Sequence, residues 1–215
     1  MDTEYRIVHA GPEDIPAIAA LFTECFKDSV LHHCGRIPKP QAMQDVFSLV
    51  YYAEPDGALL ARTGTGEVVG YCFAPTALYR LWLVGLFGGH IFKWAWRWLS
   101  GRYGFGLHPV KIILFNKLAF FRSAVTPTKA ANARILSIAV DPAWRGRGVA
   151  GALMGEAIAY FGVCNVKRVR LEVRPDNAPA IRVYEKWGFV RDGYTYDSQG
   201  PWLIMIKEME PGRDV

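Results

Sequence analysis

Glycine and arginine residues gather in a turn between an apolar run and a segment with the spacing of a helix. The stretch DPAWRGRGVAGALM, residues 141–154, contains Arg145, Gly146, Arg147 and Gly148 in succession. A glycine-rich turn that opens a helix points several backbone N–H groups at one spot, where the helix dipole adds partial positive charge. The two arginines could add charge-assisted contacts to an anion. The turn therefore predicts a phosphate-binding site; the alternative is a basic turn whose glycines serve only to reverse the chain.

The same glycines also match the dinucleotide fingerprint G-x-G-x-x-G, through Gly146, Gly148 and Gly151. In that fold the strand ends at the first glycine, and further β–α–β units follow the motif. Here residues 141–145 separate Val140 from Gly146, and only about 65 residues remain after the motif. A P-loop is also excluded, because no Gly-Lys-Ser/Thr follows. A dinucleotide oxidoreductase, which would bind NAD, is therefore disfavoured.

The apolar periodicity predicts secondary structure on both sides of the turn. Before it, we expect a strand, two helices and an antiparallel hairpin, over residues 4–9, 11–26, 38–55 and 57–75. Around it, we expect a strand over residues 134–140 and a helix from the turn to about residue 161. After it, we expect a strand, a helix and two further strands, over residues 166–177, 178–189, 194–198 and 201–209. The turn is therefore placed between a strand and a helix.

A basic segment without acidic residues lies between these two groups of elements. From Val68 to Val140 there are nine Lys or Arg and no Asp or Glu, so with a net charge of +5 the remainder is about four units negative. Residues 76–132 hold four of the seven tryptophans, and their longest uncharged apolar run, 81–92, falls short of the roughly 20 residues that span a bilayer. Three roles stay open for this segment. Its aromatic residues could be part of the core or a lid, they could cover a sugar or aromatic substrate, or residues 78–123 could contact an anionic membrane.

The composition indicates one domain over residues 1–215 with an insertion at about 76–132. The four cysteines lack C-x-x-C spacing, which argues against a zinc site and against a disulfide scaffold. We therefore expect no metal. Reduced thiols and an N-terminus without an apolar signal region predict a cytoplasmic protein, with a peripheral place at the inner face of the membrane left open. No nucleic-acid-binding module is recognised, so no nucleic acid is expected as a partner.

Two motifs resemble those of the GCN5-related N-acetyltransferases (GNAT). The run from Arg145 to Ala150 is similar to their acyl-CoA motif, Arg/Gln-x-x-Gly-x-Gly/Ala, and residues 170–189 resemble their fifth strand and fourth helix. The resemblance covers residues 4–75 loosely and 133–209 closely. It implies an α/β (α+β) fold of the GNAT type. Such a fold has a mixed, mostly antiparallel central sheet flanked by helices, and here it would carry a hydrophobic basic insertion between the third and fourth strands.

The resemblance also implies acetyl-CoA as co-substrate and assigns residues to it. The backbone of Ile138, Ala139 and Val140 would pair with the pantetheine arm like an added strand. The backbone N–H groups of six residues would hold the pyrophosphate, namely Arg145, Gly146, Arg147, Gly148, Val149 and Ala150. Asn177 would contact the cofactor.

Acetyl transfer to an amine needs a base, because an ammonium ion is not a nucleophile. In the related N-terminal acetyltransferases of ribosomal proteins, a Glu in a similar LEVR strand has this role, twelve residues before a tyrosine that protonates the departing CoA thiolate. Glu172 and Tyr184 keep that separation and are the implied base and acid. Alternatives stay open for both: Glu172 as a solvated carboxylate between Arg170 and Arg174, and Tyr184 as a ring packed in the core.

The function implied is transfer of acetyl from acetyl-CoA to a primary amine by direct attack in a ternary complex. The amine would belong to a small molecule, such as an amino sugar, or to a protein N-terminus. No cysteine is placed for a covalent intermediate. The alternative is a non-catalytic acyl-CoA-binding or membrane-associated regulatory protein on the same fold. A homodimer is an open prediction.

Overall fold

The computed structural model describes residues 4–103 and 131–209. The expected insertion over residues 76–132 and the expected membrane-contacting segment over residues 78–123 therefore lie partly outside the described residues. The structure describes residues 76–103 and 131–132 of the insertion, and residues 78–103 of the membrane-contacting segment.

The first of two four-stranded sheets has the strand order β1-β2-β3-β5, and all its neighbours are antiparallel. Its strands are β1 (Tyr5–His9), β2 (Ala58–Thr63), β3 (Val68–Phe73) and β5 (Ser137–Val140). Helices cover both of its faces, which is why β2 and β3 are apolar at successive positions rather than alternating. Ala58 and Leu60 pack against α1 (Ile15–Cys25) and α3 (Pro40–Ala53), whereas Leu59 and Ala61 pack on the side of α7 (Val149–Val163).

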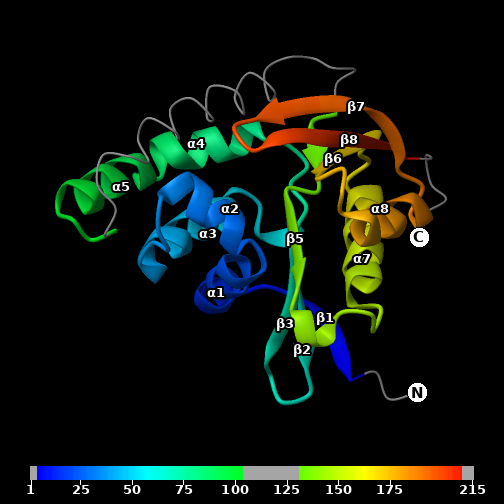
Figure 1. Cartoon of the computed structure of the whole chain (residues 1–215), viewed down its shortest axis with the longest axis horizontal. Helices are drawn as coiled ribbons and strands as arrows, with labels where there is room; N and C mark the ends of the chain where they lie inside the picture. The colour runs from blue at the N-terminus through cyan, green and yellow to red at the C-terminus, as the bar shows by residue number, and fades with distance from the viewer. Residues whose placement is uncertain (1–3, 104–130, 210–215) are drawn as a thin grey trace.

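The second sheet has the strand order β4-β6-β8-β7. Its strands are β4 (Ala133–Arg134), β6 (Arg168–Val173), β8 (Gly200–Glu208) and β7 (Val190–Asp197). The pair of β4 with β6 is parallel, and the other two pairs are antiparallel. Figure 1 shows α7 and α8 (Ala178–Lys186) on one side of the strands and α1 and α3 on the other. The mixed, mostly antiparallel sheet flanked by helices is the architecture that the sequence predicts.

Residues 134–140, expected as one strand, are divided between the two sheets. Ala133 and Arg134 pair with β6, whereas Ser137–Val140 pair with β3. The change takes place within one peptide step: Ile135 N donates to the carbonyl of Arg170 at 3.0 Å, and Leu136 N donates to that of Phe73 at 2.8 Å. Strands β5 and β6 therefore diverge from this point.

Three helices are additions to the elements expected from the sequence: α2 (Lys27–Cys34), α4 (Tyr79–Phe87) and α5 (His90–Leu99). Only Val30 of α2 is buried, so this helix carries little periodic signal. Short 3-10 turns precede α1, β2 and α7, at Pro12–Asp14, Pro55–Gly57 and Pro142–Trp144. No helix within residues 4–103 or 131–209 has both the length and the apolar character needed to span a bilayer.

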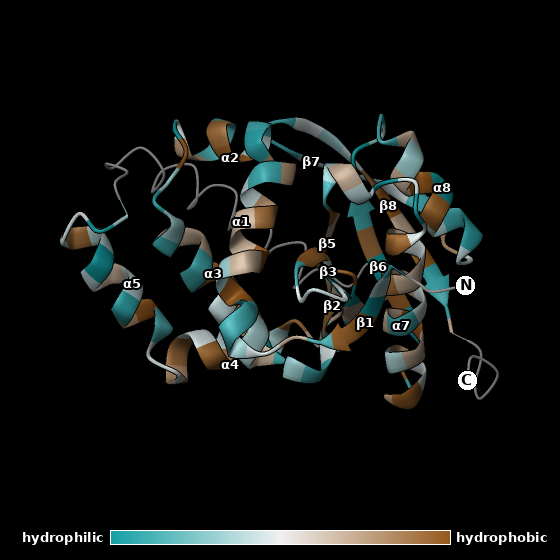
Figure 2. Cartoon of the chain, turned by 90° about the horizontal axis from the view of Figure 1, so that it is seen from below, coloured by the Kyte–Doolittle hydropathy of each residue, from teal (hydrophilic) through white to brown (hydrophobic). Residues whose placement is uncertain are grey.

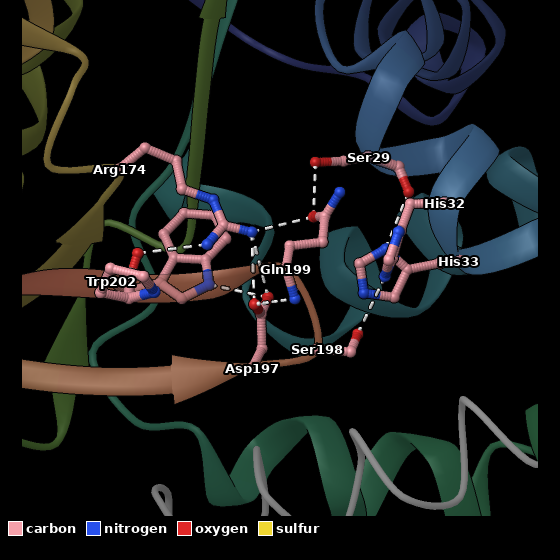
Figure 3. A network of polar contacts seen from close by, with 9 residues as sticks. Ser29, His32, His33, Arg174, Asp197, Ser198, Gln199 and Trp202 are labelled. Carbon is pink, nitrogen blue, oxygen red and sulfur yellow. Dashed lines mark hydrogen bonds and ion pairs between the residues drawn. The ribbon is translucent and has the colours of Figure 1, made fainter.

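A cluster of polar side chains joins α2 to the tip of the β7–β8 hairpin, as Figure 3 shows. We call it the α2–hairpin cluster; its members are Ser29, His32, Arg174, Asp197, Ser198, Gln199 and Trp202. From α2, Ser29 Oγ donates to Gln199 Oε1 at 2.9 Å, and His32 Nε2 lies 3.2 Å from Ser198 Oγ. Because α2 belongs to the half of the molecule around the first sheet and the hairpin to the second, the cluster holds the two halves together beyond the divergence of β5 and β6.

Asp197 is the charged centre of the α2–hairpin cluster. Trp202 Nε1 donates to its Oδ2 at 2.7 Å, Gln199 N donates to its Oδ1 at 2.8 Å, and Arg174 Nη2 lies 3.3 Å away. The Arg174 guanidinium also lies over the Trp202 ring, 3.9 Å from its centre. Burial alone would raise the pKa of Asp197, but these hydrogen bonds and the Arg174 charge outweigh it and hold the pKa below the ordinary 3.8.

Replacing Asp197 by Asn should therefore destabilise the protein in a way that depends on pH. A carboxyl whose folded pKa is depressed contributes stability above its unfolded pKa and loses it as pH falls through the folded value. We expect Asp197→Asn to lower the free energy of unfolding by about 2 kcal/mol at neutral pH. The difference in free energy between the variant and the original protein should shrink as the pH falls below the ordinary carboxyl pKa of 3.8. Urea unfolding at a series of acidic pH values measures it.

Asp56→Asn is the matched control, because Asp56 is exposed and makes no ion pair with the described residues. It should shift the free energy of unfolding by less than about 0.5 kcal/mol at every pH. A loss for Asp197→Asn that stays constant from neutral to acidic pH would contradict the charge-based account.

Candidate active site

The divergence of β5 and β6 leaves backbone edges without a neighbouring strand among the described residues. Strand β5 is the last strand of its sheet, and β6 loses β4 beyond Arg170. An unpaired strand edge presents N–H and C=O groups that can pair with an extended ligand. The predicted pantetheine-pairing residues, Ile138 to Val140, lie on β5. The carbonyl of Val140 is already in use, because it accepts from Arg145 Nε at 3.3 Å.

The N-terminus of α7 carries backbone N–H groups without intrahelical partners. Gly148, the residue before the helix, has a φ of 85°, and no side chain caps the helix there. Ala152 N donates to the Gly148 carbonyl at 3.0 Å, so the N–H groups of Val149 and Ala150 precede the first helical bond. Gly146 has a φ of 77°, and a Cβ there would meet nothing within 4 Å. The left-handed backbone, rather than a lack of space, therefore requires glycine at this position.

The arginines of the turn bind protein groups rather than pointing into the space before the helix. Arg147 Nη1 pairs with Glu4 Oε2 at 2.6 Å, and its guanidinium lies 4.8 Å from the centre of the Trp144 ring. Arg145 lies along Val140 and reaches Cys25 Sγ at 3.8 Å. The backbone N–H groups, together with the α7 dipole, are thus the part of the turn that fits the phosphates of an acyl-CoA.

Tyr184 combines a core position with an unused hydroxyl. Its ring packs edge-on against Phe189, with centres 6.2 Å apart, and only 8% of the residue is exposed. Its hydroxyl makes no hydrogen bond with the described residues. Burial raises the pKa of Tyr184, and the neighbouring Cys72 thiol of β3 adds to this, so the hydroxyl stays protonated at neutral pH. A protonated hydroxyl without a partner can serve as a proton donor.

Glu172 lies on the opposite face of β6 from the core that contains Tyr184. Its neighbours Leu171 and Val173 both belong to that core, and successive side chains of a strand alternate between faces. The Glu172 side chain is 22% exposed, and its Oε1 is held by Arg134 Nη1 at 2.8 Å and Arg170 Nη2 at 2.7 Å.

The second oxygen of Glu172, Oε2, accepts no hydrogen bond from the described residues. Arg174, the other arginine expected beside Glu172, pairs instead with Asp197. Burial lowers the pKa of Arg134, although the Glu172 carboxylate acts in the opposite direction. The carboxylate is therefore fixed in position through one oxygen, and the other oxygen is left for a further proton.

Asn177 has a structural role as the first residue before α8. Its Oδ1 accepts a hydrogen bond from Ala180 N at 3.2 Å, which caps the helix that carries Tyr184. The amide NH₂ group makes no hydrogen bond with the described residues. The predicted contact of Asn177 with the cofactor stays a prediction.

Two cysteines lie beside these groups without having been predicted. Cys25 of α1 approaches the carbonyl of Val140 at 3.5 Å, and Cys72 of β3 is fully buried near Tyr184, where burial raises its pKa to about 12. In the sequence both read as ordinary apolar positions of a helix and a strand. Within the described ranges, no three His, Cys, Asp or Glu residues are grouped so that they could hold a metal ion.

Curated proteins with similar sequences include named N-acetyltransferases. The chain is 51% identical over 57 residues to the L-amino acid N-acetyltransferase AaaT of Escherichia coli (strain K12), and this match covers 26% of the chain and 35% of AaaT. It is 32% identical over 115 residues to the ribosomal protein bS18-alanine N-acetyltransferase of Salmonella typhimurium, and this match covers 52% of the chain and 76% of that protein. The chain thus spans about a third of the first relative and three quarters of the second.

Solved structures share the fold over nearly the whole chain. The crystal structure of SsHAT has a TM-score of 0.71 at 22% identity, and the match covers 96% of this chain and 99% of that one. The ribosomal-protein-S18-alanine N-acetyltransferase of Escherichia coli has a TM-score of 0.55 at 16% identity, over 96% and 94% of the two chains.

The family model described as the acetyltransferase (GNAT) family matches residues 15–189. That span is most of the chain, and it contains the α7 turn, Glu172 and Tyr184. The chain belongs to the GNAT acetyltransferase family.

Proposed function

We propose that this protein is an acyl-CoA-dependent N-acetyltransferase that transfers acetyl from acetyl-CoA to a primary amine. The observation that carries the proposal is the division of residues 133–140 between two sheets. It creates an unpaired strand edge, β5, that ends at the uncapped N-terminus of α7. An acyl-CoA has an extended arm followed by a pyrophosphate. The arm can pair with the edge of β5, and the pyrophosphate can then bind at the N-terminus of α7.

The co-substrate is held chiefly by backbone groups in this proposal. The N–H groups from Gly146 to Ala150 bind the pyrophosphate, and the β5 backbone from Ile138 to Val140 pairs with the pantetheine amides. The N–H of Arg145, also expected there from the sequence, donates instead to the carbonyl of Pro142 at 3.4 Å. The amide of Asn177 lies at the start of α8 and adds a side-chain contact. Members of the family use acetyl-CoA, which supports this choice of co-substrate over other acyl donors.

The reaction proceeds by direct attack of the amine on the acetyl carbonyl. A C–N bond forms and the C–S bond breaks, so the amine must lose a proton and the sulfur must gain one. Glu172 Oε2 takes the proton of the amine, and the Tyr184 hydroxyl gives its proton to the sulfur. The two side chains leave β6 and α8 on opposite faces of the second sheet, and the acetyl carbonyl lies between them beside the unpaired edges.

The acceptor is the α-amine of an amino acid or of a protein N-terminus. The names of two relatives support this class, because one acts on L-amino acids and the other on the alanine of ribosomal protein bS18. The amino sugars considered from the sequence form a second class for the same assay. A non-catalytic acyl-CoA-binding protein is not favoured, since named enzymes stand among the relatives.

Four further statements from the sequence remain predictions. They are the single domain over residues 1–215, the cytoplasmic location, peripheral contact of residues 78–123 with an anionic membrane, and a homodimer. The outward face of α5 supports the membrane contact.

Replacing Gly148 by Ala should weaken binding of acetyl-CoA. A residue with a Cβ at a φ of 85° is strained by about 1–2 kcal/mol, and relief of the strain would turn the N–H groups away from the phosphates. We expect about tenfold weaker binding of CoA by isothermal titration. Gly151→Ala is the control, because Gly151 lies inside α7 without a positive φ and its Cβ would meet nothing within 4 Å. Equal affinities of the two variants for CoA would contradict the proposal that this turn binds the phosphates.

Replacing Tyr184 by Phe should lower turnover by at least about tenfold, because the sulfur then leaves without a proton donor. The measurement is release of free CoA from acetyl-CoA with a panel of amino acids, peptides and amino sugars. Tyr160→Phe serves as control, since the Tyr160 hydroxyl lies in a partly buried site near the other end of α7, where it binds Glu54 at 2.6 Å. If Tyr184→Phe turned over a good amine substrate as fast as the original protein, Tyr184 would not be the proton donor.

Replacing Glu172 by Gln should abolish or displace the acidic limb of the pH profile of kcat/KM, because that limb would report the free enzyme's base. The substitution also removes the anion shared by Arg134 and Arg170, so thermal unfolding must show that the variant is folded. Glu185→Gln, which affects a partly exposed carboxylate paired with Arg191, is the control and should leave the limb in place. If Glu172→Gln keeps the limb of the original protein, another base or a water chain takes the proton.

A further inference from the structure

Helix α5 directs Arg97 toward the protein, together with the partly buried Trp94 and Trp98, and exposes a second apolar stripe on its outer side. Asp45 of α3 is 3% exposed, and Arg97 of α5 forms an ion pair with it, with Nη1 2.6 Å from Oδ2. Tyr103 donates to the same Oδ2 at 2.7 Å, and Lys93 Nζ lies 3.9 Å from Oδ1.

The opposite face of α5 is apolar and lies in solvent. Phe92, Trp96 and Leu99 recur at helical spacing on it and are 77%, 69% and 74% exposed. Figures 1 and 2 place α5 at the far side of the molecule from α7 and α8. Trp94 and Trp98 lie on the inner side of α5 and are partly buried, so it is the outer stripe that contributes little to a core.

Helix α4 extends this apolar surface. Gly85, its one buried residue, faces Leu49 of α3, whereas Leu83, Leu86 and Phe87 are exposed, Phe87 to 85%. Phe87 and Phe92 flank the Gly88–Gly89 turn between the helices. We call these exposed side chains of the two helices the α4–α5 face: Leu83, Leu86, Phe87, Phe92, Trp96 and Leu99. Exposed apolar side chains gathered on two helices that contact each other mark a candidate interaction site.

The charges near the α4–α5 face favour an anionic surface as its occupant. Lys93 is half exposed beside it, Arg102 is exposed after α5, and no acidic residue occurs anywhere from Val68 to Val140. A second copy of the chain would bring the same cations to the interface without acids from this segment to pair them. Aromatic side chains next to cations are the composition found at lipid headgroups.

We propose that the α4–α5 face docks the protein on an anionic lipid surface. The aromatic and aliphatic side chains enter the headgroup region, and Lys93 and Arg102 contact the headgroup phosphates. The polar face of α5, which an isolated amphipathic helix would leave in water, is bound by Asp45 instead. Docking does not depend on the proposed acetyl transfer, since none of these residues belongs to the candidate active site.

Vesicle sedimentation of the full chain tests the proposal. The protein should sediment with vesicles of phosphatidylcholine mixed with phosphatidylglycerol and much less with phosphatidylcholine alone. Binding should weaken when the salt is raised, because the Debye length falls from about 10 Å at 0.1 M to about 3 Å at 1 M. Lys93→Gln and Arg102→Gln should each reduce binding by about fivefold.

The double variant Phe92→Ser with Trp96→Ser should bind anionic vesicles at least about tenfold more weakly. Its matched control is Val163→Ser with Val190→Ser, which removes two residues that are 72% and 64% exposed elsewhere on the molecule and should leave binding unchanged. Both variants should keep turnover with a soluble amine, so a failure of docking is distinguishable from a failure of the proposed reaction.

Two results would overturn the proposal. One is a lack of binding of the unaltered chain to anionic vesicles at low salt. The other is a dimer in solution that the Phe92 and Trp96 substitutions convert to a monomer, with vesicle binding unaffected by them. The second result would assign the α4–α5 face to an interface between copies.

Discussion

The arrangement of the site depends on how one short segment satisfies its backbone hydrogen bonds. Ile135 bonds to a strand of the second sheet and Leu136 to a strand of the first, so no buried N–H is left without an acceptor where the chain changes sheets. The consequence is an edge of β5 without a strand beside it. Such edges are usually covered or blunted in proteins. In this molecule the edge leads directly to the glycine turn of α7, and both are suited to a single extended ligand.

The same divergence bears on how the proposed acid and base lie. A continuous sheet would separate Tyr184, in the core with α7, from Glu172 on the other face. Among the described residues no strand lies beside Glu172 on the edge of β6 that β4 leaves after Arg170, so both side chains could serve a substrate bound there. The α2–hairpin cluster keeps this opening fixed, because it ties the far ends of the two halves through Asp197 and Arg174.

Local features of the site could be predicted from the sequence, whereas features set by distant partners could not. The left-handed glycines before α7 and the placement of Tyr184 on the following helix depend on residues close in the chain. The division of residues 134–140 depends on which strands lie on each side, and RILSIAV is apolar throughout. Glu172 was expected beside Arg174, but its second partner is Arg134, 38 residues away in the chain. Helix α2 was not predicted because it buries few side chains, so its sequence lacks the apolar periodicity of a helix.

Helix α5 shows how one buried charge can override hydrophobic periodicity. The apolar stripe of α5 would face the core if burial of side chains alone decided its orientation. A carboxylate as buried as Asp45 requires partners, because an unpaired charge in the interior is strongly unfavourable. Gln41 and Tyr103 supply two of them, and Arg97 supplies the charged one because α5 turns this residue to α3. With Arg97 turned inward, Phe92, Trp96 and Leu99 lie on the outer side of α5, where water is a poor environment for them and a lipid headgroup layer is a better one.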